Sequence, residues 1–189
     1  MAATASTMMP LGTKAPDFRL TDVTTGRVVS LDDVATDRGV LVMFICAHCP
    51  FVKHVERELA RIGRDYPGVG IVAISSNDAV AYPDDAPPAL AKQARDVGFT
   101  FPYLFDESQS VARAYAAACT PDFFLFAPDR TLVYRGQLDD SRPSNGRPVT
   151  GRDLRAALDA VSAGRAVTTD QTPSIGCNIK WKAAPAAVR

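Results

Sequence analysis

Apolar residues in the first half of the chain form two continuous runs with a helical pattern between them. The runs cover residues 40–45 and 69–75 and are rich in β-branched side chains. Such runs are typical of strands that are covered on both faces of a sheet. From Pro50 onward, apolar residues recur every three or four positions up to the breaker residues at 63–68. This spacing predicts an amphipathic helix that follows the first strand directly.

Three further helices are predicted from the residues at their ends. One follows a pair of prolines, which suit a first helical turn, and ends at a glycine, which suits a C-terminal cap. Two others begin at capping boxes, in which side chains of the first turn bond to its backbone. The proline pair and its glycine are Pro87, Pro88 and Gly98, and the boxes are Asp106 with Gln109 and Thr150 with Asp153.

Short strands and turns complete the pattern. Residues 103–105 predict a strand, residues 123–126 and 131–134 predict a hairpin, and residues 17–30 predict a small N-terminal hairpin. Strands that alternate with helices indicate an α/β fold. We therefore expect a central mixed β-sheet flanked by helices, to which the late hairpin adds antiparallel strands.

Length and composition limit the classes of protein that fit. The 189 residues suit one domain, and equal numbers of acidic and basic residues give no reason to expect nucleic acid or a membrane as partner. We expect a flexible tail over residues 1–13, the domain over 14–167, and a C-terminal tail over 168–189 that packs on the domain, because it carries Cys177 and Trp181. The N-terminus does not resemble a signal peptide, so the expected location is the cytoplasm.

Cys46 and Cys49 lie where the predicted central strand ends and the long helix begins. A helix N-terminus carries unpaired N–H groups and about half a positive charge, so it stabilises a thiolate and lowers the thiol pKa. Pro50 suits the first helical position, which leaves Cys49 as the cap. The arrangement predicts a redox-active cysteine.

Two other interpretations of these cysteines stay open. Buried cysteines often serve only as small apolar side chains. Cys46, His48 and Cys49 are also possible metal ligands, but a second ligand pair is missing, so we expect neither a metal nor another cofactor. His48 either favours the Cys49 thiolate or has no role, and His54 and turn residues such as Asp122 are expected to be solvated.

Four segments of the chain together resemble one group of proteins, the peroxiredoxin-like redoxins of the thioredoxin superfamily, which are related to the alkyl hydroperoxide reductase and thiol-specific antioxidant proteins. The resemblance extends from about residue 12 to residue 182 and implies a thioredoxin-like fold. The segments are residues 44–53 (FICAHCPFVK), 118–126 (ACTPDFFLF), 134–140 (YRGQLDD) and 174–182 (SIGCNIKWK).

The resemblance implies which cysteine is the nucleophile. In thioredoxin-like sequences the first redox cysteine stands five residues after a phenylalanine, which here is Phe44, and this places it at Cys49. The second redox position then falls on Val52, so Cys46 precedes the nucleophile instead of following it on the helix. Peroxiredoxins carry a threonine three residues before the reactive cysteine, and Cys46 stands there. The usual peroxide-orienting hydroxyl is therefore missing.

The resemblance also implies a proline loop beside the nucleophile. Pro121 matches the cis-proline of this superfamily, and Cys119 would then lie near Cys49 and could resolve its disulfides. Cys177 either folds over the same site or is a packed free cysteine. We expect Cys46 to pair with Cys49, because only two residues separate them, with Cys119 as the alternative.

These expectations favour a thiol-disulfide oxidoreductase that acts on protein or small-molecule thiols and disulfides. A weak thiol peroxidase that acts on peroxide is the second hypothesis. A metal-binding or partner-binding module without catalytic activity is the third.

Overall fold

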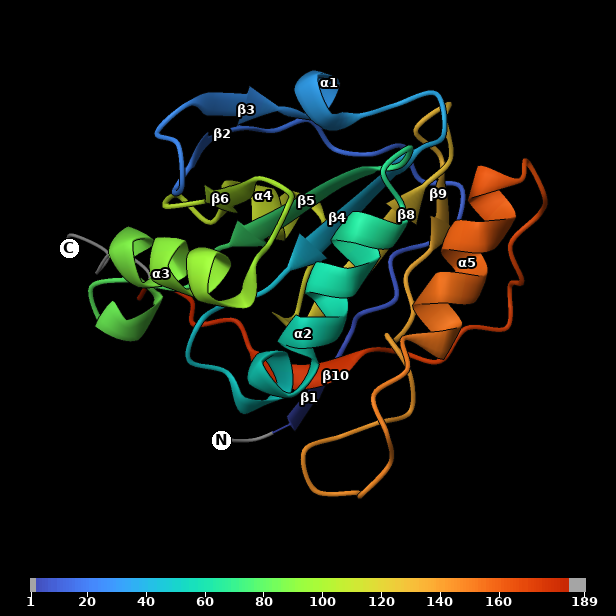
Figure 1. Cartoon of the computed structure of the whole chain (residues 1–189). Helices are drawn as coiled ribbons and strands as arrows, with labels where there is room; N and C mark the ends of the chain where they lie inside the picture. The colour runs from blue at the N-terminus through green and yellow to red at the C-terminus, as the bar shows by residue number, and fades with distance from the viewer. Residues whose placement is uncertain (1–2, 184–189) are drawn as a thin grey trace, which may run out of the picture.

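A computed structural model of the chain describes residues 3–183. Its centre is a seven-stranded mixed sheet (Figure 1). The strands lie in the order β3 (Val28–Ser30), β2 (Arg19–Asp22), β6 (Tyr103–Phe105), β5 (Gly70–Ser75), β4 (Val40–Phe44), β8 (Asp122–Phe126) and β9 (Leu132–Tyr134). Strands β4, β5 and β6 are parallel, while the hairpins β2–β3 and β8–β9 add antiparallel strands. The predicted α/β class, the mixed sheet and both hairpins are confirmed.

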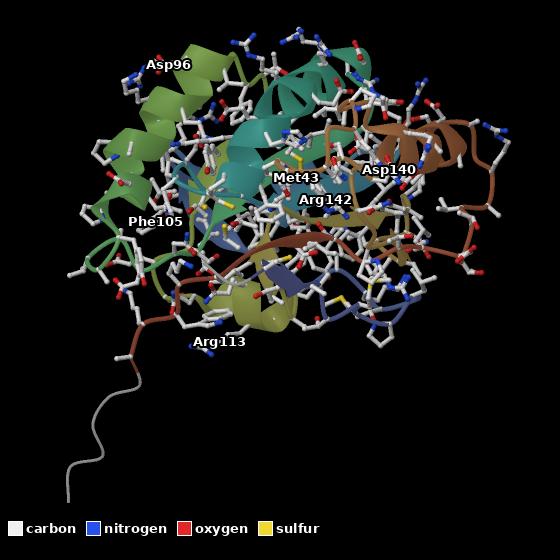
Figure 2. The ribbon with its side chains drawn as sticks, turned by 90° about the horizontal axis from the view of Figure 1, so that it is seen from below. Met43, Asp96, Phe105, Arg113, Asp140 and Arg142 are labelled. Carbon is white, nitrogen blue, oxygen red and sulfur yellow. The ribbon has the colours of Figure 1, made fainter. Side chains whose placement is uncertain are left out.

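Helices cover both faces of the sheet, as Figures 1 and 2 show. Alternate residues of β4 point to opposite faces, so that Met43 belongs to one apolar core and Val42 to the other. The Met43 core is closed by α2 (Pro50–Asp65), α3 (Pro87–Val97) and α5 (Arg152–Ser162), and the Val42 core by α1 (Leu31–Val34) and α4 (Ser110–Ala114). A 3₁₀ turn, η1 (Pro83–Asp85), precedes α3. Burial of β4 and β5 on both faces explains why their sequences are continuously apolar.

The helix ends agree with the sequence where backbone conformation determines them. Pro50 is the first residue of α2, and Gly98 caps α3 in the left-handed conformation with φ 80°. The two predicted capping boxes are wrong. Gln109 and Gly151 occupy the N-cap positions with φ values of 62° and 67°, and neither of these N-cap residues caps its helix with a side chain. Asp106 is instead buried beneath α4, where it accepts hydrogen bonds from Ser76 Oγ and the Ala112 N–H.

A second, three-stranded antiparallel sheet joins the two ends of the chain. Its order is β1 (Ala3–Ala5), β10 (Ile175–Asn178) and β7 (Cys119–Thr120). The structure differs from the flexible tail that we expected over residues 1–13, because β1 pairs with β10 and Met9 is buried. The described part of the C-terminal tail lies on the domain through β10, whereas residues 184–189 lie outside the described residues.

None of the helices within residues 3–183 is long and apolar enough to cross a membrane.

Candidate active site around Cys49

Cys49 is the N-cap residue of α2 and is completely buried. Its backbone is extended (φ −69°, ψ 124°), and the first helical residue after it is proline. Because Pro50 has no N–H, the free amides nearest to the Cys49 sulfur belong to the next residues of the helix, among them Val52. The position of Cys49 at the helix cap, which we expected from the sequence, is therefore the position that the structure gives it.

The surroundings of Cys49 favour its thiolate. A hydrogen bond from the Cys46 thiol is the largest influence, and bonds from Cys177, the Val52 N–H and Thr120 add to it. Together they outweigh burial and lower the pKa of Cys49 to about 5. The lowered pKa favours the thiolate of Cys49 at neutral pH, which is the nucleophilic form of cysteine.

Cys46 serves as a hydrogen-bond donor in this arrangement. Its sulfur lies 3.3 Å from the Thr120 hydroxyl oxygen, and the residue is buried. The hydrogen bond to Cys49, followed by burial and the charge of Asp85, raises the pKa of the Cys46 thiol well above its ordinary value. The two cysteines of the loop therefore differ in protonation, with the proton on Cys46 and the charge on Cys49.

Cys177 is the cysteine whose position the sequence left open. Strand β10 carries it to Cys49, and the two sulfur atoms are 2.8 Å apart. Burial and the hydrogen bond to Cys49 raise the pKa of Cys177 to about 12. The SIGCNIKWK segment was the only signal in the sequence that associated Cys177 with the site.

Cys119 and Pro121 lie on the loop that faces the nucleophile. The Thr120–Pro121 peptide bond is cis, as the resemblance implies. The carbonyl oxygen of Thr120 lies 3.2 Å from the Cys49 sulfur. Cys119, however, donates to the Pro121 carbonyl oxygen at 3.6 Å, and no hydrogen bond within residues 3–183 joins it to Cys49. Burial raises the pKa of the Cys119 thiol, which keeps it protonated.

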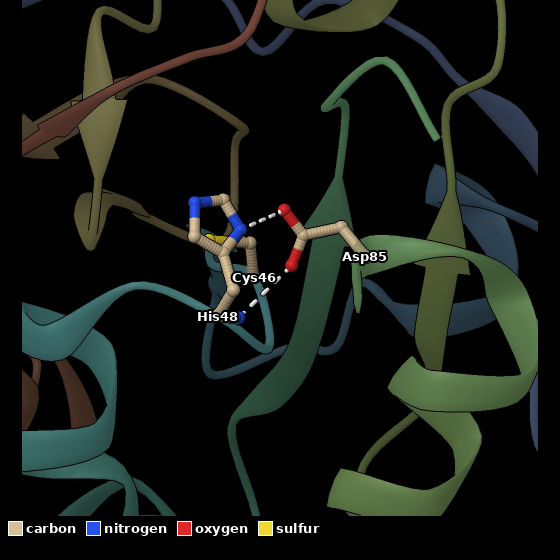
Figure 3. A group of neighbouring side chains, drawn as sticks. All are labelled: Cys46, His48 and Asp85. Carbon is tan, nitrogen blue, oxygen red and sulfur yellow. Dashed lines mark hydrogen bonds and ion pairs between the residues drawn. The ribbon is translucent and has the colours of Figure 1, made fainter. Parts of the chain in front are cut away.

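Asp85 is a residue of the site that sequence analysis missed. Its Oδ1 atom accepts hydrogen bonds from the backbone N–H groups of Ala47 (2.8 Å) and His48 (3.0 Å). Its Oδ2 atom lies 2.5 Å from His48 Nδ1 and accepts from Asn77 Nδ2 at 2.6 Å. Figure 3 shows the imidazole ring facing this carboxylate. The buried aspartate thus determines the conformation of the loop between Cys46 and Cys49.

Cys46, His48 and Asp85 form the only group of three or more possible ligand side chains within residues 3–183 whose donor atoms lie close enough together to hold a metal ion. The ligand atoms of Cys46, His48 and Asp85 all lie within 4.8 Å of one another (Figure 3). Both carboxylate oxygens of Asp85 are already engaged by N–H donors, and its bond to His48 occupies the imidazole nitrogen nearest to it. A cation would have to replace these bonds, so we assign the group to loop conformation and not to metal binding.

Of two polar residues that we expected to be solvated, Asp122 is fully buried and His54 is half-buried. Asp122 is fully buried next to Pro121, and burial raises its pKa to about 7. His54 lines a narrow crevice beside Phe51 and Pro121. The His54 Nε2 and Ser141 Oγ atoms at this crevice are buried and have no hydrogen-bond partner within residues 3–183.

Comparison with known proteins places this chain in a family. Residues 11–135 match the AhpC/TSA family. The thiol-disulfide oxidoreductase ResA of Geobacillus kaustophilus (strain HTA426) is 32% identical over 127 residues, which are 65% of this chain and 66% of that protein. The match thus spans about two thirds of the length of this curated relative. The chain belongs to the AhpC/TSA family and is a peroxiredoxin-like redoxin of the thioredoxin superfamily.

Solved structures agree with this assignment. An uncharacterized conserved protein from Geobacillus kaustophilus is 58% identical with a TM-score of 0.96, over 98% of this chain and 99% of that one. A hypothetical protein from Sinorhizobium meliloti 1021 is 51% identical with a TM-score of 0.93, and the match covers 96% of this chain and 100% of that one. A thiol-disulfide oxidoreductase from Bacteroides fragilis shares the fold. It is 20% identical with a TM-score of 0.55, and the match covers 65% of this chain and 89% of that one.

Proposed function

We propose that this protein is a thiol-disulfide oxidoreductase in which Cys49 is the nucleophile. The observation that carries the proposal is the state of Cys49 at the N-cap of α2, where hydrogen bonds from neighbouring thiols lower its pKa to about 5. A structural cysteine in an apolar core has its pKa raised, as Cys119 does. The curated relatives named thiol-disulfide oxidoreductase support the same chemistry.

In the proposed reaction the Cys49 thiolate attacks one sulfur of a partner disulfide. The attack forms a mixed disulfide and releases the other partner sulfur as a thiolate. A second cysteine of this chain then attacks Cys49 and releases the partner as a thiol. Protein disulfides and the disulfides of small thiols such as glutathione are the classes of partner that fit, and the matching thiols are the products.

The crevice beside Pro121 supports a peptide as one such partner. It borders the proline loop next to Cys49, and His54 Nε2 and Ser141 Oγ beside it are buried without a hydrogen-bond partner among residues 3–183, so a peptide that opens the crevice would satisfy them. The N–H and C=O groups of an extended peptide supply matching donors and acceptors. His54→Leu is expected to raise the KM for a protein disulfide and leave the KM for oxidised glutathione unchanged.

Replacement of the nucleophile tests the proposal. Cys49→Ser should abolish reduction of oxidised glutathione and of a disulfide-containing protein by the full chain, whereas Asn178→Ala, an exposed change on neighbouring strand β10, should retain both activities. Full activity in Cys49→Ser would refute the assignment. Both proteins should unfold at similar urea concentrations, which excludes general loss of structure.

Weak thiol peroxidase activity is a second candidate, favoured by membership of the AhpC/TSA family. The Cys49 thiolate would attack a peroxide and become a sulfenic acid, while one oxygen leaves as water or alcohol. Such activity would give the protein an antioxidant role. Peroxide consumption, with trapping of the sulfenic acid in wild type and in Cys46→Ser, distinguishes it from disulfide reduction.

We also place the protein in the cytoplasm. A dithiol that reduces disulfides has to be returned to its reduced state, and the cytosolic glutathione and thioredoxin pools keep thiols reduced. Cell fractionation with detection of the intact chain tests this location, and recovery outside the cytoplasmic fraction would contradict it.

A further inference from the structure

Strand β10 is held beside the nucleophile from both of its edges. On one edge Cys177 stands opposite Thr120 of β7, and on the other it stands opposite Ala3 of β1. Ser174 Oγ donates a 2.7 Å hydrogen bond to the Pro121 carbonyl oxygen at the beginning of the strand. The position of the Cys177 sulfur is therefore determined by the backbone of two neighbouring strands.

A close approach of two backbones brings the strand to this position. A Cβ atom on Gly176 would lie 2.0 Å from the Thr120 carbonyl oxygen, far inside van der Waals contact. Only glycine allows β10 to come this near to the proline loop. The consequence is the 2.8 Å separation between the sulfurs of Cys177 and Cys49.

We propose that Cys177 is the resolving cysteine, and that Cys49 and Cys177 form the redox disulfide of this protein. The inference rests on the proposed function and names the second thiol that the function requires. In this proposal Cys177 takes the resolving role that we expected of Cys46 from its closeness in sequence. It also replaces the alternative, Cys119, whose thiol donates to the Pro121 carbonyl oxygen.

The proposed step is balanced without any further reactant. In the mixed disulfide, Cys49 is bonded to a sulfur of the partner. The Cys177 sulfur attacks Cys49, the Cys49–Cys177 bond forms, the bond to the partner breaks, and the proton of Cys177 passes to the released partner thiol. Two thiols of the protein are oxidised and one partner disulfide is reduced. A dithiol donor returns the protein to its starting state by the reverse exchange.

The hydrogen bonds of the reduced site suit this order of events. While Cys49 is a thiolate, it accepts from Cys177 and its charge keeps the Cys177 proton in place. Once Cys49 is bonded to a partner, that charge is gone and one cause of the high Cys177 pKa is removed. The pKa of Cys177 therefore falls once Cys49 has reacted, while burial, the largest cause of its rise, stays in place. Cys49 is completely covered in the reduced form, so the segments that cover its sulfur have to open before a partner can reach it.

Disulfide mapping of the full chain tests the proposal. The protein is oxidised with oxidised glutathione, free thiols are blocked, and tryptic peptides are analysed by mass spectrometry. No Lys or Arg separates Cys46 from Cys49, so a bond between them stays within one peptide, whereas a bond to Cys177 joins two peptides. We expect the joined peptides in wild type, and also in Cys46→Ser, which assigns the bond to Cys49.

Variants give the complementary result. Cys177→Ser should stop as a mixed disulfide between Cys49 and glutathione and lose multiple turnover, while Asn178→Ala on the same strand should behave as wild type. A Cys46–Cys49 bond in wild type, or unchanged turnover in Cys177→Ser, would overturn the inference. If Cys177→Ser does not fold, the disulfide maps of wild type and Cys46→Ser are sufficient to test the Cys49–Cys177 bond. Loss of activity in Cys49→Ser with unchanged Cys177→Ser refutes only the resolving role, whereas an active Cys49→Ser refutes the proposed function itself.

Discussion

Asp85 accepts hydrogen bonds from both the backbone and the ring of His48, although 37 positions separate the two residues. The carboxylate lies at the end of a 3₁₀ turn before α3, and His48 lies immediately before the cap of α2. Since Asp85 also accepts from the Ala47 N–H, it connects two elements that flank the nucleophile. The backbone amides that precede Cys49 are thus satisfied by a side chain instead of water.

Removal of this carboxylate should destabilise the protein. Asp85→Ala leaves a buried donor of Asn77 and part-buried N–H donors of Ala47 and His48 without acceptors, and each unmet buried donor costs about 1–3 kcal/mol. We expect the free energy of unfolding, measured by urea denaturation, to fall by about 3 kcal/mol. Asp84→Ala is the matched control, because the neighbouring Asp84 is exposed. Equal stability of the two variants would show that the loop does not depend on Asp85.

The thiolate of Cys49 should be visible in a pH titration. Ultraviolet thiolate absorbance is expected to rise with a midpoint near pH 5 in wild type, and this transition should be missing in Cys49→Ser. Because folding lowers the pKa of Cys49, the thiolate stabilises the folded state at pH values above the pKa of a free thiol. That stabilisation is lost as the pH falls through about 5. A midpoint near the ordinary thiol value of about 8.5 would contradict the prediction.

The Cys46 thiol should be responsible for much of this low pKa. Cys46→Ala removes the strongest hydrogen bond to Cys49, and the midpoint of the Cys49 titration should rise by about one to two pH units. Cys46→Ser keeps a donor at the same place and is expected to restore most of the wild-type midpoint. Both variants remove the Cys46 sulfur, but only Cys46→Ser keeps a hydrogen-bond donor. A difference between their midpoints therefore reports the effect of the hydrogen bond on the Cys49 pKa and not the effect of lost packing. Identical midpoints in Ala and Ser variants would assign the low pKa to other groups.

Much of the fold follows from local pattern in the sequence. The continuous apolar runs of β4 and β5, the Pro50 start of α2 and the Gly98 cap were predicted, because periodicity and backbone restrictions act over a few residues. The capping boxes failed for a physical reason. Asp106 bonds both to Ser76 of a distant segment and to the Ala112 N–H in the first turn of α4, while Gln109 takes the N-cap position, so the residues do not form the predicted box.

The candidate site was predictable only in part. Cys49 could be found because the transition from strand to helix is a local feature of the sequence. The positions of Asp85 and Cys177 depend on contacts across 37 and 128 positions, which no spacing in the sequence records. The expectation that Cys46 would be the partner came from sequence proximity. That expectation stays a prediction, and the strand from the C-terminal segment that reaches the same sulfur offers Cys177 as the proposed alternative.

Asp122 should make stability decrease with rising pH. Burial raises its pKa from 3.8 to about 7, so the folded state holds a proton that the unfolded state releases at lower pH. Stability is therefore complete below about pH 4 and is lost progressively up to about pH 7, by at most about 4 kcal/mol. Asp122→Asn should remove most of this dependence in urea titrations, and Glu107→Gln, which neutralises an exposed acid, should not. Parallel pH profiles for wild type and Asp122→Asn would contradict the prediction.

Gly176→Ala should separate the two sulfurs of the proposed redox pair. The added Cβ would lie 2.0 Å from the Thr120 carbonyl oxygen, so β10 has to move away from β7, and Cys177 moves with it. Cys49 is then less covered, and we expect faster alkylation of Cys49 together with a smaller yield of the Cys49–Cys177 disulfide under oxidised glutathione. Asn178→Ala controls for substitution on this strand. If the variant alkylates and oxidises as wild type does, close approach of β10 is not what brings Cys177 to Cys49.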